Sequence, residues 1–122
     1  SYPELVDYLS SRKIKSDFVV HCYTGDKTIA KKLLDLGSYI SFTGIVTFKK
    51  ASELRDVAEY IPNNKMMIET DSPYLSPHPN RGKTNYPKNL IYIAECISKV
   101  KKMDLEIFCS YLKRNTVKFY KL

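Results

Sequence analysis

The sequence predicts an α/β fold in which parallel strands alternate with helices, and three observations lead to this prediction. Short runs of β-branched, aromatic and other apolar residues are separated by segments of about ten residues whose apolar positions have helical spacing. These strand-like runs are apolar on both faces, as in a sheet that helices cover. Candidate functional side chains stand at the ends of two of the runs, where parallel α/β folds gather their chemistry.

The first half of the chain is predicted to begin with a helix and to continue with a strand–helix unit. Residues 3–13 form the helix, because Pro3 suits a first helical turn and apolar residues follow on one face. Residues 18–22 form a buried strand, and the turn at residues 24–26 offers an N-cap for the next helix. That helix ends before Gly37, a residue suited to a C-cap.

Two more strands are predicted in the rest of the chain. Residues 39–43 form one strand, and Ser52 is expected to cap the helix after it, which Pro62 ends. Residues 66–69 form the last strand, and a proline-rich loop leads from it to two or three final helices. The apolar stripes of these helices are Leu90, Ala94 and Ile97, and Leu105, Phe108 and Leu112. The strands and helices together form βαβ units.

Length and composition indicate one folded domain over residues 1–122. Hydrophobic residues make up 43% of the chain and charged residues 27%, which is typical of a globular protein. No apolar run is long enough for a membrane span, and the start lacks the pattern of a signal peptide. The three widely spaced cysteines form no CxxC pair, so buried reduced thiols in a cytoplasmic protein are expected.

The chain is basic, with twenty Lys and Arg against thirteen acidic residues and a formal net charge of +7. A basic balance attracts polyanions because binding releases their counterions, so nucleic acid is a candidate partner. The lysines are scattered, however, and genome composition is an equally simple source of the excess. Charge alone therefore leaves the partner open.

Two residues at strand ends are candidate metal ligands. His21 lies near the end of the first predicted strand, and Asp71 follows the third. A neutral imidazole and a carboxylate are ordinary ligands of a divalent metal ion, and the carboxylate can also take a proton from metal-bound water. Each residue also has a plainer interpretation: His21 as a core residue satisfied by backbone, and Asp71 as the start of a turn or a helix cap.

Further charged residues flank Asp71. Glu69 points to the same side as Asp71 if both are extended, so it either brings a second acid to the site or anchors the loop through backbone N–H groups. The second role is favoured, because two unshared carboxylates that close would repel. Arg81 and Lys83 are candidate phosphate contacts, since both side chains match phosphate oxygens. The alternative is that both side chains are simply solvated in the loop, and the two residues by themselves favour this alternative.

Three motifs of the chain resemble the TatD family of metal-dependent deoxyribonucleases. They are residues 19–25 (VVHCYTG), 36–44 (LGSYISFTG) and 67–75 (MIETDSPYL), in the order and spacing of that family. Residues 79–83 (PNRGK) and Asn115 also fit the pattern, so the likeness extends from the first strand to the end of the chain.

The resemblance implies a TIM-like (β/α)8 barrel, with this chain as its C-terminal portion of about three βα units plus terminal helices. It also implies divalent metal ions at the carboxyl face, two per complete site, with Mg²⁺ expected and Mn²⁺ or Zn²⁺ as alternatives. The implied reaction is hydrolysis of phosphodiesters, typically in DNA. By the same resemblance His21 is a metal ligand, Asp71 is a ligand and the general base, and Arg81 and Lys83 lie near the substrate.

Some parts of the family's pattern have no counterpart in these 122 residues. They are an early His-x-His strand, a bridging glutamate and a further ligand histidine. Because a closed barrel needs about 200 or more residues, we expect the N-terminal barrel half, or a self-associated partner, to complete the site. The chain is then either a piece of a larger protein or a true short product.

Two rival functions are an amidohydrolase-type enzyme acting on a small ester, lactone or amide, and a non-catalytic basic fragment that binds nucleic acid.

Overall fold

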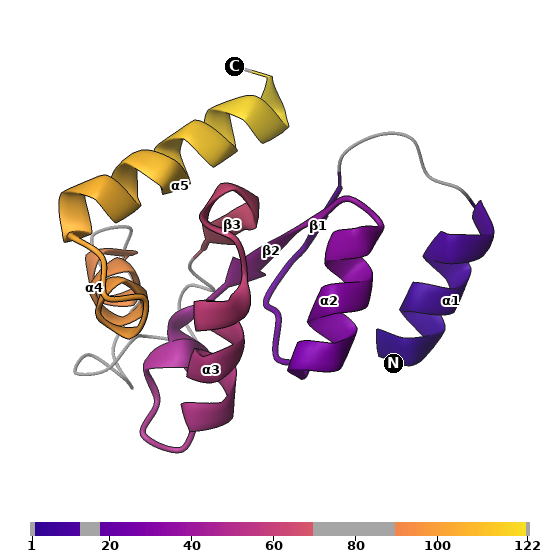
Figure 1. Cartoon of the computed structure of the whole chain (residues 1–122), viewed down its shortest axis with the longest axis horizontal. Coiled ribbons are helices and arrows are strands. Elements are labelled where there is room, and N and C mark those ends of the chain that lie inside the picture. The colour runs from indigo at the N-terminus through magenta and orange to yellow at the C-terminus, as the bar shows by residue number, and fades with distance from the viewer. Residues whose placement is uncertain (1, 13–17, 70–89, 122) are drawn as a thin grey trace.

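A parallel three-stranded sheet forms the centre of the computed structural model, which describes residues 2–12, 18–69 and 90–121. Its strands lie side by side in chain order as β1 (Phe18–Val20), β2 (Ser38–Phe42) and β3 (Met66–Ile68) (Figure 1). Ile40 of β2 is opposite Val20 on one side and Met66 on the other. The direction of the strands and the helices between them confirm the predicted βαβ arrangement.

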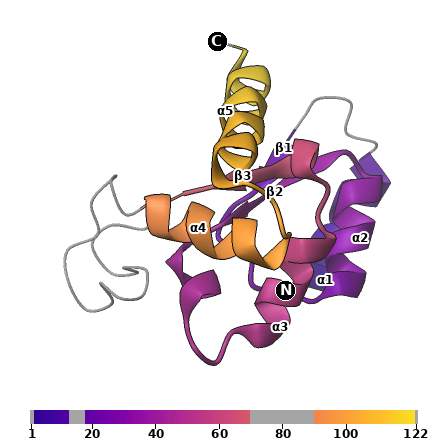
Figure 2. The same cartoon turned by 60° about the vertical axis from the view of Figure 1, so that its left-hand side comes forward.

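Helices form a row along the sheet. The α-helices among the described residues are α1 (Tyr2–Arg12), α2 (Lys27–Asp35), α3 (Ser52–Tyr60), α4 (Leu90–Val100) and α5 (Leu105–Tyr120). From α1 to α5 each helix contacts the next one along the chain, and α5 also contacts β3. Figures 1 and 2 show this succession, with α4 between α3 and α5. Two helices, α4 and α5, therefore finish the chain, within the predicted two or three.

The strand residues that pack on the helices alternate along each strand, as the pleat of a sheet requires. They are Phe18, Val20, Ile40, Phe42, Met66 and Ile68. The residues between them point to the opposite face: Val19, Tyr39, Ser41 and Met67. Near the start of β2 that face is covered too, because the Tyr39 ring meets the Phe119 ring edge-on, with ring centroids 5.3 Å apart.

Helix ends show where local signals succeeded and where one failed. The predicted turn caps α2 through Asp26, whose Oδ1 accepts from the Ile29 amide at 2.9 Å. Ser52, expected to be the N-cap of α3, is instead its first helical residue. The N-cap is Ala51, whose carbonyl accepts from the Arg55 amide while its own amide donates to the Phe48 carbonyl. The helix thus starts one residue early because a turn of the preceding loop leads directly into it.

Two short 3-10 helices, η1 (Gly44–Thr47) and η2 (Asn63–Lys65), were not predicted. None of the described helices is both long and apolar enough to cross a membrane. The three cysteines all lie in the described ranges and form no disulfide with one another, but each is only partly buried, so the expectation of buried thiols was wrong in that respect.

Candidate metal centre

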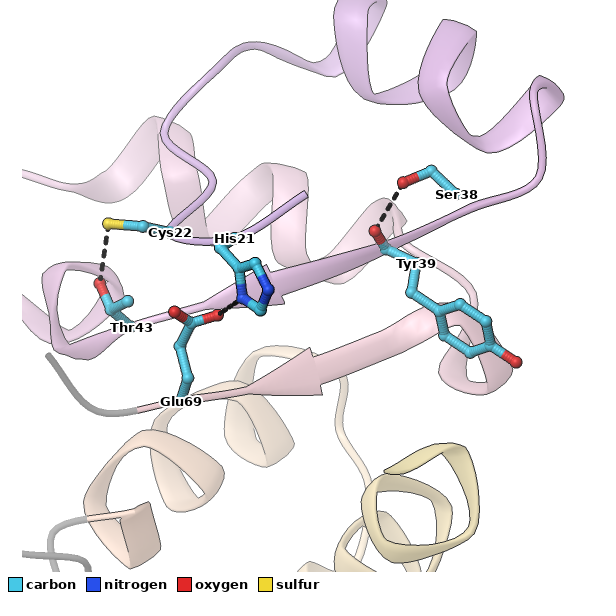
Figure 3. Close-up of polar contacts among 6 residues, drawn as sticks. All are labelled: His21, Cys22, Ser38, Tyr39, Thr43 and Glu69. Carbon is cyan, nitrogen blue, oxygen red and sulfur yellow. Dashed lines mark hydrogen bonds and ion pairs between the residues drawn. The ribbon is translucent and has the colours of Figure 1, made fainter. Parts of the chain in front are cut away.

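His21 and Glu69 contact each other at the carboxyl end of the sheet. The imidazole Nδ1 lies 2.8 Å from Oε2 of the carboxylate (Figure 3). The His21 side chain is 59% exposed and that of Glu69 is 25% exposed, so the pair is at the surface with its histidine outermost. The structure therefore brings a candidate ligand and an acidic partner together at the edge where parallel strands end.

The sheet explains why residues 48 positions apart meet. His21 follows β1 directly, and Glu69 follows β3, whose ladder it extends by donating its amide to the Phe42 carbonyl at 2.9 Å. Alternation places both side chains on the face that points away from the helices, next to Val19 and Met67 respectively. The pair thus reaches across the end of the central strand β2.

The contact sets which nitrogen of His21 can hold a metal ion. An ionised carboxylate only accepts hydrogen bonds, so Nδ1 donates its proton to Glu69 and the lone pair of the neutral ring lies on Nε2. Ligand histidines commonly use a carboxylate in this way to fix the tautomer and the ring orientation. His21 and Glu69 therefore fit one ligand of a metal centre together with the group that orients it.

His21 and Glu69 do not make a complete ligand set by themselves. No group of three or more His, Cys, Asp or Glu suited to a metal ion occurs among the described residues. The other predicted site residues, Asp71, Arg81 and Lys83, lie outside the described residues, so the roles assigned to them stay predictions.

Glu69 has a partner that the sequence did not suggest. Two roles were open for its carboxylate, a second acid at the site or an anchor of the following loop through backbone amides, and the second was favoured because two unshared carboxylates that close would repel. The carboxylate contacts His21, whose N–H compensates its charge. The residues of the following loop lie outside the described ones, so the anchoring role stays a prediction. The sequence offered no signal for this partner, since strands β1 and β3 become neighbours of one another only through β2.

The turn after His21 is closely packed. The Tyr23 ring is 1% exposed and its hydroxyl donates to the Asp26 carbonyl, while burial raises the pKa of this phenol far above its ordinary value. The Thr24 amide donates to the Tyr2 hydroxyl of α1 at 3.1 Å. A Cβ at Gly25 would lie 2.6 Å from the Tyr23 hydroxyl oxygen, so only glycine fits under the ring. Tyr23 is thus part of the core that supports the site.

Side chains from two helices donate hydrogen bonds to the loop after β2. Arg55 of α3 donates through Nη1 to the carbonyls of Val46 (3.1 Å) and Phe48 (2.6 Å) and through Nη2 to that of Lys49 (3.4 Å). The Cys96 thiol of α4 also donates to the Val46 carbonyl, at 3.8 Å. Sequence reasoning missed Arg55, because nothing in its spacing shows that its partners are backbone carbonyls.

Comparison with known proteins agrees with the geometry. The family model described as "TatD related DNase" matches residues 1–121. The chain is 52% identical over 88 residues to the metal-dependent hydrolase YcfH of Escherichia coli and 39% identical over 104 residues to the metal-dependent hydrolase YabD of Bacillus subtilis. It is 32% identical over 125 residues to the metal-dependent hydrolase MG009 of Mycoplasma genitalium.

These matches cover most of the chain but less than half of each relative. They include 72%, 85% and 98% of this chain, and 33%, 41% and 48% of YcfH, YabD and MG009 respectively. The chain therefore spans about a third to a half of the length of the curated relatives it matches.

Solved structures also match nearly all of this chain but less than half of their own length. The TatD homologue YJJV of Escherichia coli superposes with a TM-score of 0.91 at 23% identity, covering 99% of this chain and 47% of that one. A TatD family hydrolase of Entamoeba histolytica superposes with a TM-score of 0.77 at 26% identity, covering 96% and 46%. The fold is that of part of a TatD-like TIM barrel, and the chain belongs to the TatD-related DNase family of metal-dependent hydrolases.

Proposed function

We propose that this chain contributes part of the metal site of a phosphodiester hydrolase that acts on DNA. The observation that carries the proposal is the His21–Glu69 contact at the carboxyl end of the sheet, in a chain of this family. The net charge of +7 supports a polyanionic substrate, because basic proteins gain affinity for DNA by releasing its counterions.

Each residue has a defined part in the proposed site. Glu69 holds the His21 ring by accepting from Nδ1, which leaves Nε2 to ligate a divalent ion. Asp71 is a second ligand and takes the proton of the attacking water. Arg81 and Lys83 contact phosphate oxygens of the substrate. When bound, two divalent ions, with Mg²⁺ the natural choice for DNA, would supply Lewis-acid activation of water and neutralise phosphate charge.

The proposed site needs further ligands. One histidine and one aspartate are too few for a two-metal centre. We propose that this chain is the C-terminal portion of the barrel and that the N-terminal half supplies the remaining strands and ligands. That half is either further polypeptide of the same protein or a separate chain, and self-association of two copies is the alternative.

The activity test uses 3′-labelled single-stranded DNA with Mg²⁺ or Mn²⁺. The full chain is assayed alone and after refolding with the part of YcfH that precedes its 88-residue match, beside EDTA and Asp71→Ala controls. Cleavage is expected only in the mixture, and both controls should abolish it. A mixture that forms a complex yet leaves DNA intact would count against phosphodiester hydrolysis.

A second assay fixes the substrate class. The same mixture is offered a nitrophenyl phosphodiester and a nitrophenyl carboxylic ester. We expect the phosphodiester to be hydrolysed faster; preference for the ester would favour an amidohydrolase-type activity. Salt-sensitive DNA binding that EDTA does not affect, without any cleavage, would favour a non-catalytic nucleic-acid-binding role.

A further inference from the structure

The residue after His21 has a backbone conformation that residues with a Cβ rarely adopt. Cys22 has a φ of 50°, in the left-handed region that favours glycine. Two other non-glycine residues in the described ranges have positive φ, Lys102 and Lys121. Lys121 caps α5 and Lys102 follows the end of α4, where left-handed residues are common. Cys22, in contrast, follows a strand and precedes a turn, so no helix end accounts for its conformation.

The ladder between β1 and β2 shows what the left-handed residue does. Val20 is opposite Ile40, and in this register the amide that reaches the Ser41 carbonyl would be that of Cys22. The amide that donates to Ser41, at 2.9 Å, is instead that of Tyr23. One extra residue is therefore accommodated between Val20 and Tyr23, which is the definition of a β-bulge.

A bulge re-aims the side chains beside it. It ends the regular strand at Val20 and lets His21 lean across β2 toward the Glu69 carboxylate, while the Cys22 side chain turns toward Thr43 (Figure 3). We propose that the left-handed Cys22 is a positioning residue: its bulge sets the direction of the His21 ring and thereby the nitrogen that faces the metal. The inference rests on the proposed function only in taking His21 as a metal ligand.

Packing on both sides holds the strained residue in place. The Cys22 Sγ lies 3.8 Å from the Thr43 Oγ1, whose oxygen also accepts from the Ile45 amide at the start of η1. After Cys22 the chain is fixed by the buried Tyr23 ring and by the hydrogen bond from Thr24 to Tyr2. A sparsely populated conformation persists where its surroundings determine it in this way, and such residues cluster at functional sites.

The test compares residues that can and cannot adopt a left-handed conformation. Glycine and asparagine tolerate it at position 22, whereas a β-branched valine does not. Lys102→Val is the matched control, because it also places valine at a residue of similar φ, 56°, in the turn that follows α4. Cys22→Ala is a milder variant for the case in which Cys22→Val does not fold.

The readout is the tautomer of His21 in the metal-free full chain. Nitrogen-15 shifts of the ring are recorded at about pH 8.5, above the ordinary pKa of histidine. The unmodified chain, Cys22→Gly, Cys22→Asn and Lys102→Val should all carry the proton on Nδ1, bonded to Glu69. Cys22→Val should lose that bond, so the proton shifts to Nε2, and its affinity for Zn²⁺ should fall on the order of tenfold or more.

Three results would overturn the inference. The first is an unchanged Nδ1–H tautomer in folded Cys22→Val, or in Cys22→Ala if valine prevents folding. The second is loss of that tautomer in Lys102→Val, and the third is its loss in Cys22→Gly and Cys22→Asn. A different result bears on the proposed function. If Zn²⁺ leaves the His21 shifts of the unmodified chain unaltered, His21 is no ligand there, while the metal-free spectra still decide the role of Cys22.

Discussion

The side-chain amide of Asn115 lies 2.7 Å from the carbonyl oxygen of Met66, and this bond fastens the last helix to the first residue of β3. The same Nδ2 donates to the Asn63 carbonyl in η2, also at 2.7 Å. Asn115 is 3% exposed; its bond to the Met66 carbonyl is buried and its bond to the Asn63 carbonyl is partly buried. The residue thus joins the C-terminal helix to the strand that leads into Glu69.

Replacing Asn115 with leucine should lower the free energy of unfolding by about 1–3 kcal/mol, because a buried and a partly buried carbonyl lose their donor. Urea denaturation measures the change. Asn64→Leu, at an exposed position of η2, is the control and should have little effect. Equal stability of the two variants would show that these carbonyls find other donors.

Replacing Glu69 with alanine should weaken Zn²⁺ binding roughly 10–100-fold, because His21 loses the acceptor that fixes its ring. Equilibrium dialysis of the full chain measures the affinity. Glu53→Ala removes the same charge from an exposed position of α3 and should leave the affinity unchanged. If both variants lose affinity equally, the effect is one of net charge and not of orientation.

Replacing Arg55 with methionine should loosen the loop after β2, because three carbonyls lose a charged donor. Hydrogen exchange should then quicken at the amides of Phe48 and Ala51, which bond within that loop. We expect a loss of about 1.5–3 kcal/mol in unfolding free energy. Arg114→Met, on the exposed side of α5, provides the comparison. Unchanged exchange at Phe48 and Ala51 would argue that Arg55 is dispensable for the loop.

Cys96 should make stability fall at alkaline pH. Burial raises the pKa of this thiol above its ordinary value of 9.0, although Arg55 and Lys99 act in the opposite direction. Above pH 9.0 the unfolded chain loses the thiol proton while the folded chain keeps it, so the folded state binds more protons and the unfolding free energy decreases with pH.

The check for Cys96 is a pair of urea titrations from about pH 7 to about pH 10, on the unmodified chain and on Cys96→Ala. The difference in stability between the two should shrink as the pH rises, because contributions from other groups, Cys109 among them, are common to both. A difference that stays constant or grows across this range would show that Cys96 titrates normally in the folded state.

Hydrophobic pattern was sufficient to predict the order of strands and helices, since each strand is a short apolar run and each helix keeps its own periodicity. It also placed His21 correctly at a strand end. It could not predict the Glu69 partner, because that contact depends on register across three strands. Nor could it predict that Arg55 holds the loop after β2, because the acceptors are backbone carbonyls, which every residue carries. The C-terminal place of the chain in the barrel and the roles of Asp71, Arg81 and Lys83 stay predictions.

The His21–Glu69 contact has a further consequence for the folding of the sheet. It links the two outer strands across β2, so it requires both strand pairings at once. A slip of either outer strand by one residue would turn its side chains to the other face and separate the imidazole from the carboxylate. A chain that folds with a shifted strand would therefore present no oriented nitrogen to a metal ion. If His21 holds a metal ion as proposed, the ion binds molecules with both strands in register more tightly than misregistered ones, and so stabilises the correctly assembled sheet.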